Sequence, residues 1–149
     1  MFMKDVFSDS DRHYISLLQE NINRIAGNSA NCKTWLVTLV AAIMALQLTS
    51  VELRNILWVA LGLIVLFYLL DSYYLGLERK FIALEEAFVK AAKDKQEGEI
   101  TNSIYSFNIK SVNDKHASMC SALVSPSTYP FYLTLFLIVL AVCLWPLIF

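Results

Sequence analysis

The chain of 149 residues contains few glycines, prolines and cysteines, the residue types that characterise several common protein classes. It contains 4 glycines and 3 prolines, so its composition is not that of a disordered or fibrous protein. Its 3 cysteines, Cys32, Cys120 and Cys143, fit neither a disulfide framework nor a metal-site spacing. The formal net charge is −1, which predicts no strong attraction to nucleic acid. We therefore expect no cofactor, no metal and no direct nucleic-acid binding.

Residues that could carry catalysis are also scarce. The only histidines, His13 and His116, lie in different segments, and neither follows an arginine at the spacing of the known Arg–His ribonucleases. No glycine-rich phosphate loop and no Ser-His-Asp grouping can be proposed. The sequence thus predicts that the protein is not an enzyme, and no cleavable signal peptide is expected at its N-terminus.

Long apolar stretches are what the sequence has in excess. Hydrophobic residues make up 57% of the chain and charged residues 17%, against about 25% charged in a typical soluble domain. Residues 34–51, 55–70 and 116–149 contain no Asp, Glu, Lys or Arg. A bilayer is crossed by about 20 apolar residues in a helix. We therefore predict an all-α integral membrane protein with three transmembrane helices, at about 33–50, 55–72 and 129–149.

The first two predicted spans extend beyond the apolar stretches as long helices. After an N-terminal tail (1–11), helical spacing of apolar residues begins near Arg12 and leads directly into the first span; these residues are Tyr14, Leu18, Ile22 and Ile25. Ser8, Ser10 or Asp11 could cap this helix. Residues 12–76 then form an amphipathic helix plus a transmembrane hairpin. The helix of the second span continues to about Asp94.

A heptad seam follows the second span, within a predicted cytoplasmic helical segment (77–128). Its members are spaced alternately by four and three residues; they are Leu77, Phe81, Leu84 and Phe88. Because the soluble part of the chain is thin, we expect this seam to be an oligomer contact between copies. Beyond it, we expect a turn at 95–102, a short extended segment at 104–112 and a short helix within 115–124.

The distribution of positive charge predicts the orientation. Eleven of the 12 Lys and Arg residues precede the first span or lie between the second and third, and only Arg54 lies in the hairpin loop. Cytoplasmic flanks carry the excess of positive charge. The N-terminus and residues 77–128 are therefore predicted to be cytoplasmic, with the C-terminus outside a bacterial inner membrane.

Two groups of polar residues near the spans are candidate functional positions. Asp71 ends the second span; it is either an interface residue or a carboxylate that faces an oligomer axis or a neighbouring arginine. A polar patch lies at the entrance of the first span; its members are Asn21, Asn28, Ser29, Asn31 and Cys32. They either line a polar pore together with Asp71, or form helix–helix hydrogen bonds near a local break at Gly27.

Three segments of the chain resemble a known family. The sequence LDSYYLGLERKF at 70–81 is similar to a signature that closes the second span in RipA-like octameric bacterial membrane proteins. The junction SPSTYPFY at 125–132 and the helix at 14–35 fit the same family. More distantly, the chain resembles the membrane accessory proteins of RNA-targeting CRISPR systems. Those proteins carry a remnant Arg–His motif that this chain lacks, which speaks against a nuclease role.

The resemblance implies a homo-oligomeric ring, octameric in that family, whose spans surround a central opening. It also implies a role in anti-phage defence beside a soluble defence protein. Our first hypothesis is a membrane-perturbing or channel-like effector whose partners are the bilayer and its own copies. The alternative is a non-conducting scaffold that recruits a soluble partner through residues 79–95. A membrane-bound enzyme is the weakest of the three hypotheses.

Overall fold

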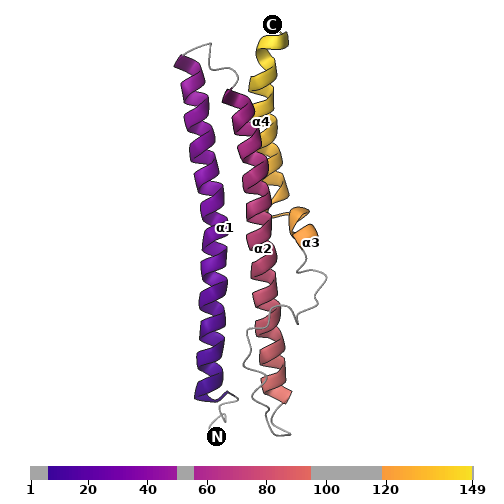
Figure 1. Ribbon diagram of the computed structural model, residues 1–149. Helices are drawn as coiled ribbons and strands as arrows, with labels where there is room; N and C mark the ends of the chain where they lie inside the picture. The colour runs from indigo at the N-terminus through magenta and orange to yellow at the C-terminus, as the bar shows by residue number, and fades with distance from the viewer. Residues whose placement is uncertain (1–6, 50–55, 95–118, 149) are drawn as a thin grey trace, which may run out of the picture.

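The computed structural model describes residues 7–49, 56–94 and 119–148. Helix α1 (Asp9–Thr49, 41 residues) and helix α2 (Ile56–Asp94, 39 residues) run antiparallel as one long hairpin (Figure 1). At 1.5 Å per residue, each is roughly 60 Å long. Helix α4 (Tyr129–Ile148) packs along the first half of α2, and the short helix α3 (Met119–Leu123) lies beside the middle of α2. The described residues thus form only helices and connecting turns, which confirms the all-α prediction.

The helix boundaries agree closely with the hydrophobic pattern. α2 runs unbroken to Asp94, and α3 lies inside the expected range of 115–124. α1 begins at Asp9, ahead of the predicted start near Arg12, and continues through Gly27 without a break. The predictions for the hairpin loop and for residues 95–102 and 104–112 fall outside the described residues.

The start of α1 is determined by a reciprocal cap. The Ser8 hydroxyl accepts the Asp11 N–H at 3.2 Å, and the Asp11 carboxylate accepts the Ser8 N–H at 2.9 Å. This arrangement satisfies two backbone donors that the first helical turn would leave unpaired. Asp11 also places negative charge at the positive end of the helix dipole. Of the three candidate caps, the structure therefore selects Ser8, assisted by Asp11.

Loss of this cap is expected to loosen the first turns of α1. Replacing Ser8 by alanine should cost about 1 kcal/mol of local helix stability, because the Asp11 N–H loses its acceptor. Amide hydrogen exchange of residues 9–14 would measure the change. The matched control is Ser10→Ala, which removes an exposed hydroxyl from the first turn of the same helix. Equal exchange rates in the two variants would contradict the assignment of the cap.

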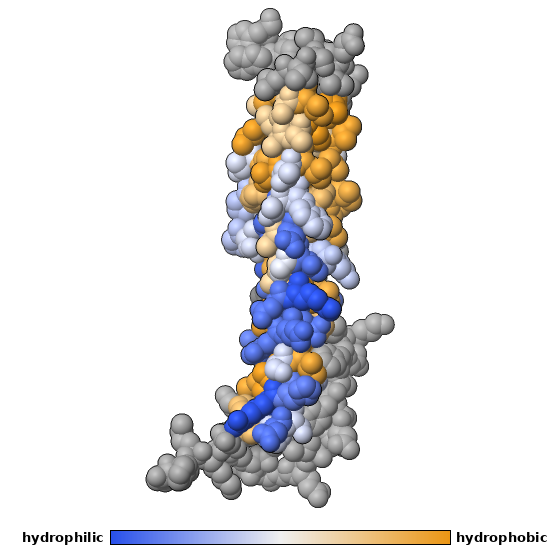
Figure 2. All heavy atoms as spheres, turned by 90° about the vertical axis from the view of Figure 1, so that its left-hand side faces the viewer, coloured by the Kyte–Doolittle hydropathy of each residue, from blue (hydrophilic) through white to orange (hydrophobic). Residues whose placement is uncertain are grey.

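The hairpin is divided by polarity into two halves of similar length. We call residues 34–49, 56–70 and α4 the apolar half, and residues 9–28 and 73–94 the polar half. Figure 2 shows the division on the α1 side of the molecule, with apolar residues above and hydrophilic residues below. α1 and α2 are each long and apolar enough, by length and composition, to cross a membrane. In α4, the segment Tyr129–Leu144 is apolar but shorter than the apolar helices α1 and α2.

Each half has its own hydrophobic core. In the apolar half, three helices contribute buried side chains to one cluster; it contains Leu36, Val40, Leu57, Ala60, Leu61, Ile64, Tyr132, Val139 and Cys143. In the polar half, α1 and α2 form a second cluster among the described residues; it contains Tyr14, Leu18, Ile25, Phe81, Leu84, Phe88 and Ala92. The rings of Tyr14 and Phe88 are 4.6 Å apart, and burial raises the pKa of the Tyr14 phenol.

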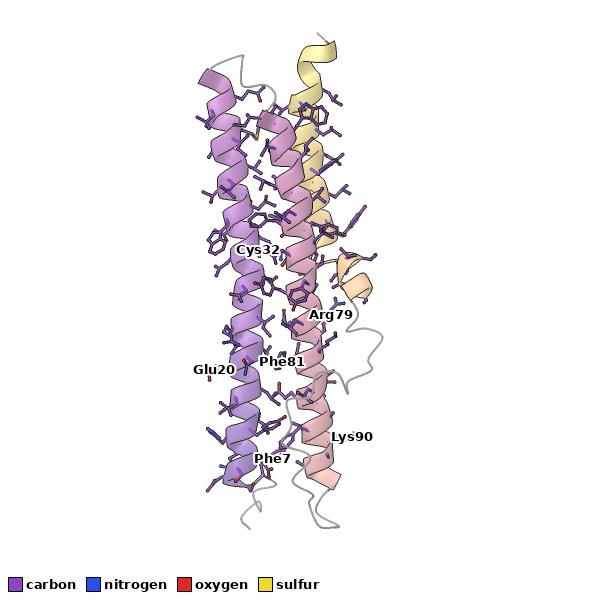
Figure 3. All side chains as sticks on the ribbon, in the orientation of Figure 1. Phe7, Glu20, Cys32, Arg79, Phe81 and Lys90 are labelled. Atoms are coloured by element: carbon purple, nitrogen blue, oxygen red, sulfur yellow. The ribbon has the colours of Figure 1, made fainter. Side chains whose placement is uncertain are left out.

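In the second cluster, the heptad seam packs within the chain, while its contact with a second copy stays a prediction. Phe81, Leu84 and Phe88 are buried against α1 of the same chain. Figure 3 shows Phe81 in the space between the two helices. Leu77 is half-buried and packs against the same cluster. The physical reason is the amphipathic face of α1, which lies alongside over the same length, so α1 covers the seam within the chain.

Candidate functional site: a buried carboxylate where three helices meet

Asp71 lies between the two cores, near the middle of α2. Its side chain is fully buried, as is that of the next residue, Ser72. An ionised carboxylate buried without partners would cost many kcal/mol of solvation free energy. Groups on the neighbouring helices must therefore offset the solvation free energy that the Asp71 carboxylate loses on burial. These partners define the site.

Helix α1 supplies the two direct partners of Asp71. The Ser29 hydroxyl donates a hydrogen bond to Asp71 Oδ1. Lys33 Nζ lies 2.7 Å from Asp71 Oδ2 and donates to the Ser29 hydroxyl at 3.3 Å. Ser29 and Lys33 are four residues apart, so the helix places them on one face. The Lys33 side chain is 26% exposed, so this ion pair connects a fully buried carboxylate to the surface of the hairpin.

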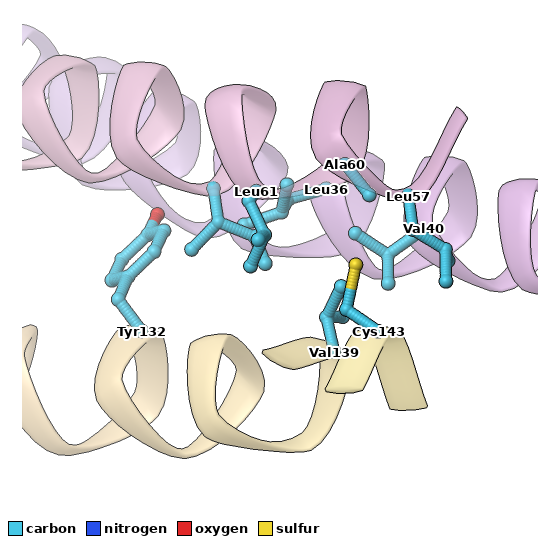
Figure 4. Packing of buried hydrophobic residues seen from close by; sticks show 9 residues of the cluster. Leu36, Val40, Leu57, Ala60, Leu61, Tyr132, Val139 and Cys143 are labelled. Atoms are coloured by element: carbon cyan, nitrogen blue, oxygen red, sulfur yellow. The ribbon is translucent and has the colours of Figure 1, made fainter. Parts of the chain in front are cut away.

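Helix α4 contributes the third component, Tyr132. Its side chain is buried, and its hydroxyl makes no hydrogen bond with a described residue. Figure 4 shows Tyr132 reaching from α4 towards the other two helices. Its ring also packs on Tyr68, with centroids 5.4 Å apart. Asp71 thus bonds to α1, and Tyr132 connects α4 to α2 through Tyr68, three residues before Asp71.

A set of hydrogen bonds holds the α3–α4 connection against α2 on both sides of Asp71. The Tyr68 hydroxyl donates to the Leu123 carbonyl at 2.7 Å. Arg79 donates to the hydroxyls of Ser121 at 3.2 Å and Ser125 at 2.9 Å. The Ser125 carbonyl in turn accepts the N–H groups that begin α4. Because these contacts fix the start of α4, they also fix the position of Tyr132 relative to Asp71.

This arrangement is a polar latch, which we define as Ser29, Lys33, Asp71 and Tyr132. The charges of Lys33 and Asp71 cancel, and every member bridges two helices. A buried pair of this kind contributes geometric specificity more than net stability. Among the described residues, no group of three or more His, Cys, Asp or Glu side chains could hold a metal ion. The contacts of Ser29 and Lys33 with Asp71 fix the alignment of α1 with α2.

The structure separates the three asparagines from Asp71. The Asn21 amide donates to the Leu17 carbonyl of its own helix at 2.8 Å and accepts from Arg24 at 2.9 Å. Asn28 is half-buried and Asn31 is exposed. Asp71, Ser29 and Cys32 are the buried members of the predicted polar groups, and Asp71 contacts Ser29 and Lys33 rather than an asparagine. Within one chain, the four residues do not form a continuous polar lining.

Sequence reasoning found Asp71 and placed Ser29 in a polar patch that could make helix–helix hydrogen bonds, but it missed Lys33 and Tyr132 as neighbours of Asp71. Lys33 fits the pattern of a membrane-interface lysine, and Tyr132 is one of many apolar and aromatic residues in the third predicted span. One signal for Ser29 was present, because it continues the spacing of Leu18 and Ile25 along the inner face of α1. Tyr132 could not be found from periodicity, since its position depends on how α4 docks on the hairpin.

Comparison with known proteins identifies no relative in which this site could be compared. No protein-family model, no curated protein and no solved structure matches the chain.

Proposed function

We propose that the chain is an integral membrane protein in which the apolar half crosses the bilayer with three helices. Two observations support this. Only 17% of the apolar window of α1 and 33% of that of α2 is buried inside the chain, whereas the core helix of a soluble protein is mostly buried. Large side chains point outward on both helices, including Trp58, 57% exposed, and Leu66, 59% exposed. In a bilayer these side chains face lipid at no cost.

With the apolar half in a bacterial inner membrane, the polar half projects into the cytoplasm as a two-helix rod. The charge distribution favours this orientation, because the positive-inside rule assigns the lysine- and arginine-rich flanks to the cytoplasm. The latch then lies at the boundary between membrane and cytoplasm. A buried charged side chain at that depth commonly marks a functional site.

We propose further that the protein is a homo-oligomeric, membrane-perturbing effector of bacterial anti-phage defence. The observation that carries this proposal is the latch itself. While it is closed, the carboxylate is neutralised and α4 is held on the hairpin. If α4 separates from the hairpin, Asp71 and Lys33 become exposed at the membrane boundary, where unpaired charges recruit water. The resemblance to octameric membrane proteins favours a ring of copies as the conducting form.

Leakage from liposomes tests the effector proposal. Purified protein reconstituted with Lys33→Met, which removes the partner of the buried carboxylate, is expected to release a trapped dye at least several-fold faster than wild type. The control is Lys90→Met, an exposed lysine at the far end of the rod. If the latch variant and the control leak at the same basal rate, the latch does not control permeability and the effector proposal fails.

The outer surface of the rod favours one second candidate, a non-conducting scaffold. With its apolar seam closed inside, the rod exposes charged side chains that include Glu20, Arg24, Glu86 and Lys90. Figure 3 shows Glu20 and Lys90 on the outer sides of their helices. Such a surface could dock a soluble partner by charge complementarity. Stoichiometric co-purification of a soluble protein that is lost on reversing Glu86 and Lys90, with no leakage in any variant, would favour the scaffold.

A further inference from the structure

A groove runs between α2 and α4 in the apolar half, on the outside of the latch. Its volume is about 190 Å³. One wall comes from α2 and the other from α4, and the lining is almost entirely apolar; it consists of Ile64, Val65, Tyr68, Tyr129, Tyr132, Leu133 and Phe136. A space of this size would hold about six water molecules at the density of liquid water. An apolar lining offers them few hydrogen-bond partners, so water is a poor occupant.

The lining changes in polarity along the axis of the hairpin. Figure 1 shows that α2 and α4 run in opposite directions. From the residue order along each helix, Tyr68 and Tyr129 therefore lie at the end of the groove nearer the polar half. Ile64 and Phe136 lie at the other end, deeper in the apolar half. All three tyrosines of the groove thus lie towards the polar half. This gradient matches an amphiphile whose polar end points to the cytoplasmic side.

The rim of the groove opens to the outside of the molecule. Val65 is 49% exposed, Leu133 is 38% exposed and Tyr129 is 50% exposed. If the apolar half lies in a bilayer, as proposed above, the medium at this rim is lipid. Acyl chains then reach the groove directly, and their headgroups lie at the level of Tyr129 and the α3–α4 turn.

We propose that the α2–α4 groove is a binding site for one acyl chain of a phospholipid, oriented with its headgroup beside Tyr129. This inference rests on the proposed membrane insertion. Among the lining residues of the groove is Tyr132, the buried latch member on α4, whose ring packs on Tyr68 of α2. A bound chain therefore supports Tyr132 against α2, so lipid occupancy favours the closed arrangement of α4 on the hairpin.

Native mass spectrometry of the full-length protein, purified in mild detergent and incubated with phosphatidylglycerol, tests the site. Leu133→Trp and Val65→Phe narrow the groove from opposite walls. Leu137→Trp and Leu66→Phe are matched controls, because both residues are exposed but do not line the groove. We expect saturable retention of one lipid per chain in wild type and both controls. Retention should fall at least ten-fold in both groove variants.

Three experimental outcomes distinguish failure of the lipid site from failure of the proposed membrane insertion. Equal lipid retention in groove variants and controls, with unchanged helical content by circular dichroism, overturns the lipid site alone. Lipid binding that never saturates in wild type overturns it as well, since the contact is then general solvation by lipid. Release of the wild-type protein from membranes by alkaline carbonate overturns the membrane insertion and the lipid site together.

Discussion

Lys33→Met is expected to destabilise the hairpin by about 3 kcal/mol, because breaking a buried ion pair from one side leaves an uncompensated charge. Asp71 is fully buried, and Lys33 Nζ is its cationic partner at 2.7 Å. The Ser29 hydroxyl alone cannot replace a full positive charge. Equilibrium unfolding in mixed detergent micelles would measure the loss as a shift in the midpoint.

A double variant tests whether this loss of stability comes from the Lys33–Asp71 ion pair. In Lys33→Met/Asp71→Asn, the buried charge is removed together with its partner, and the introduced amide keeps a hydrogen-bonding group towards Ser29. We expect the double variant to recover most of the lost stability, with a coupling free energy of about 1–3 kcal/mol. Lys90→Met, at an exposed position, should change stability by less than about 0.5 kcal/mol. Additive effects of the two latch substitutions would show that Lys33 and Asp71 do not interact.

Phe88→Ala is expected to cost about 3–5 kcal/mol, the usual loss for truncating a buried aromatic side chain. Phe88 is 3% exposed and packs on the ring of Tyr14. Because its partners belong to the same chain, the loss should not depend on protein concentration. Urea unfolding of the polar half, followed by hydrogen exchange of residues 81–92 at two protein concentrations ten-fold apart, would measure it.

The same helix offers a control for the seam. Ile82 is 37% exposed on the outer side of α2, so Ile82→Ala should cost less than about 1 kcal/mol. A destabilisation by Phe88→Ala that disappears on raising the protein concentration would mean that copies share the seam. That result would support the oligomer contact predicted from the heptad pattern and contradict the intrachain packing.

Periodicity was a reliable guide to the helices because each extends over many turns. The apolar spacing from Tyr14 to Ile25 and from Leu77 to Phe88 predicted that both helices continue past the apolar stretches. The capping residue of α1 was harder to predict, since Ser8, Ser10 and Asp11 are all good capping residues. The choice depends on which side chain reaches the N–H groups of the first turn.

The sequence by itself determined the all-helical class, the lengths of α1, α2 and α4, and the division into apolar and polar halves. Each of these depends on local propensity and on the hydrophobicity of consecutive residues. Only the tertiary structure decided what covers the heptad seam and what neutralises Asp71. Both depend on the alignment of α1 with α2, which brings Ser29 and Lys33 within reach of a carboxylate on the other arm of the hairpin. Tyr132 joins them only because α4 docks on α2, a contact that no spacing along the chain encodes.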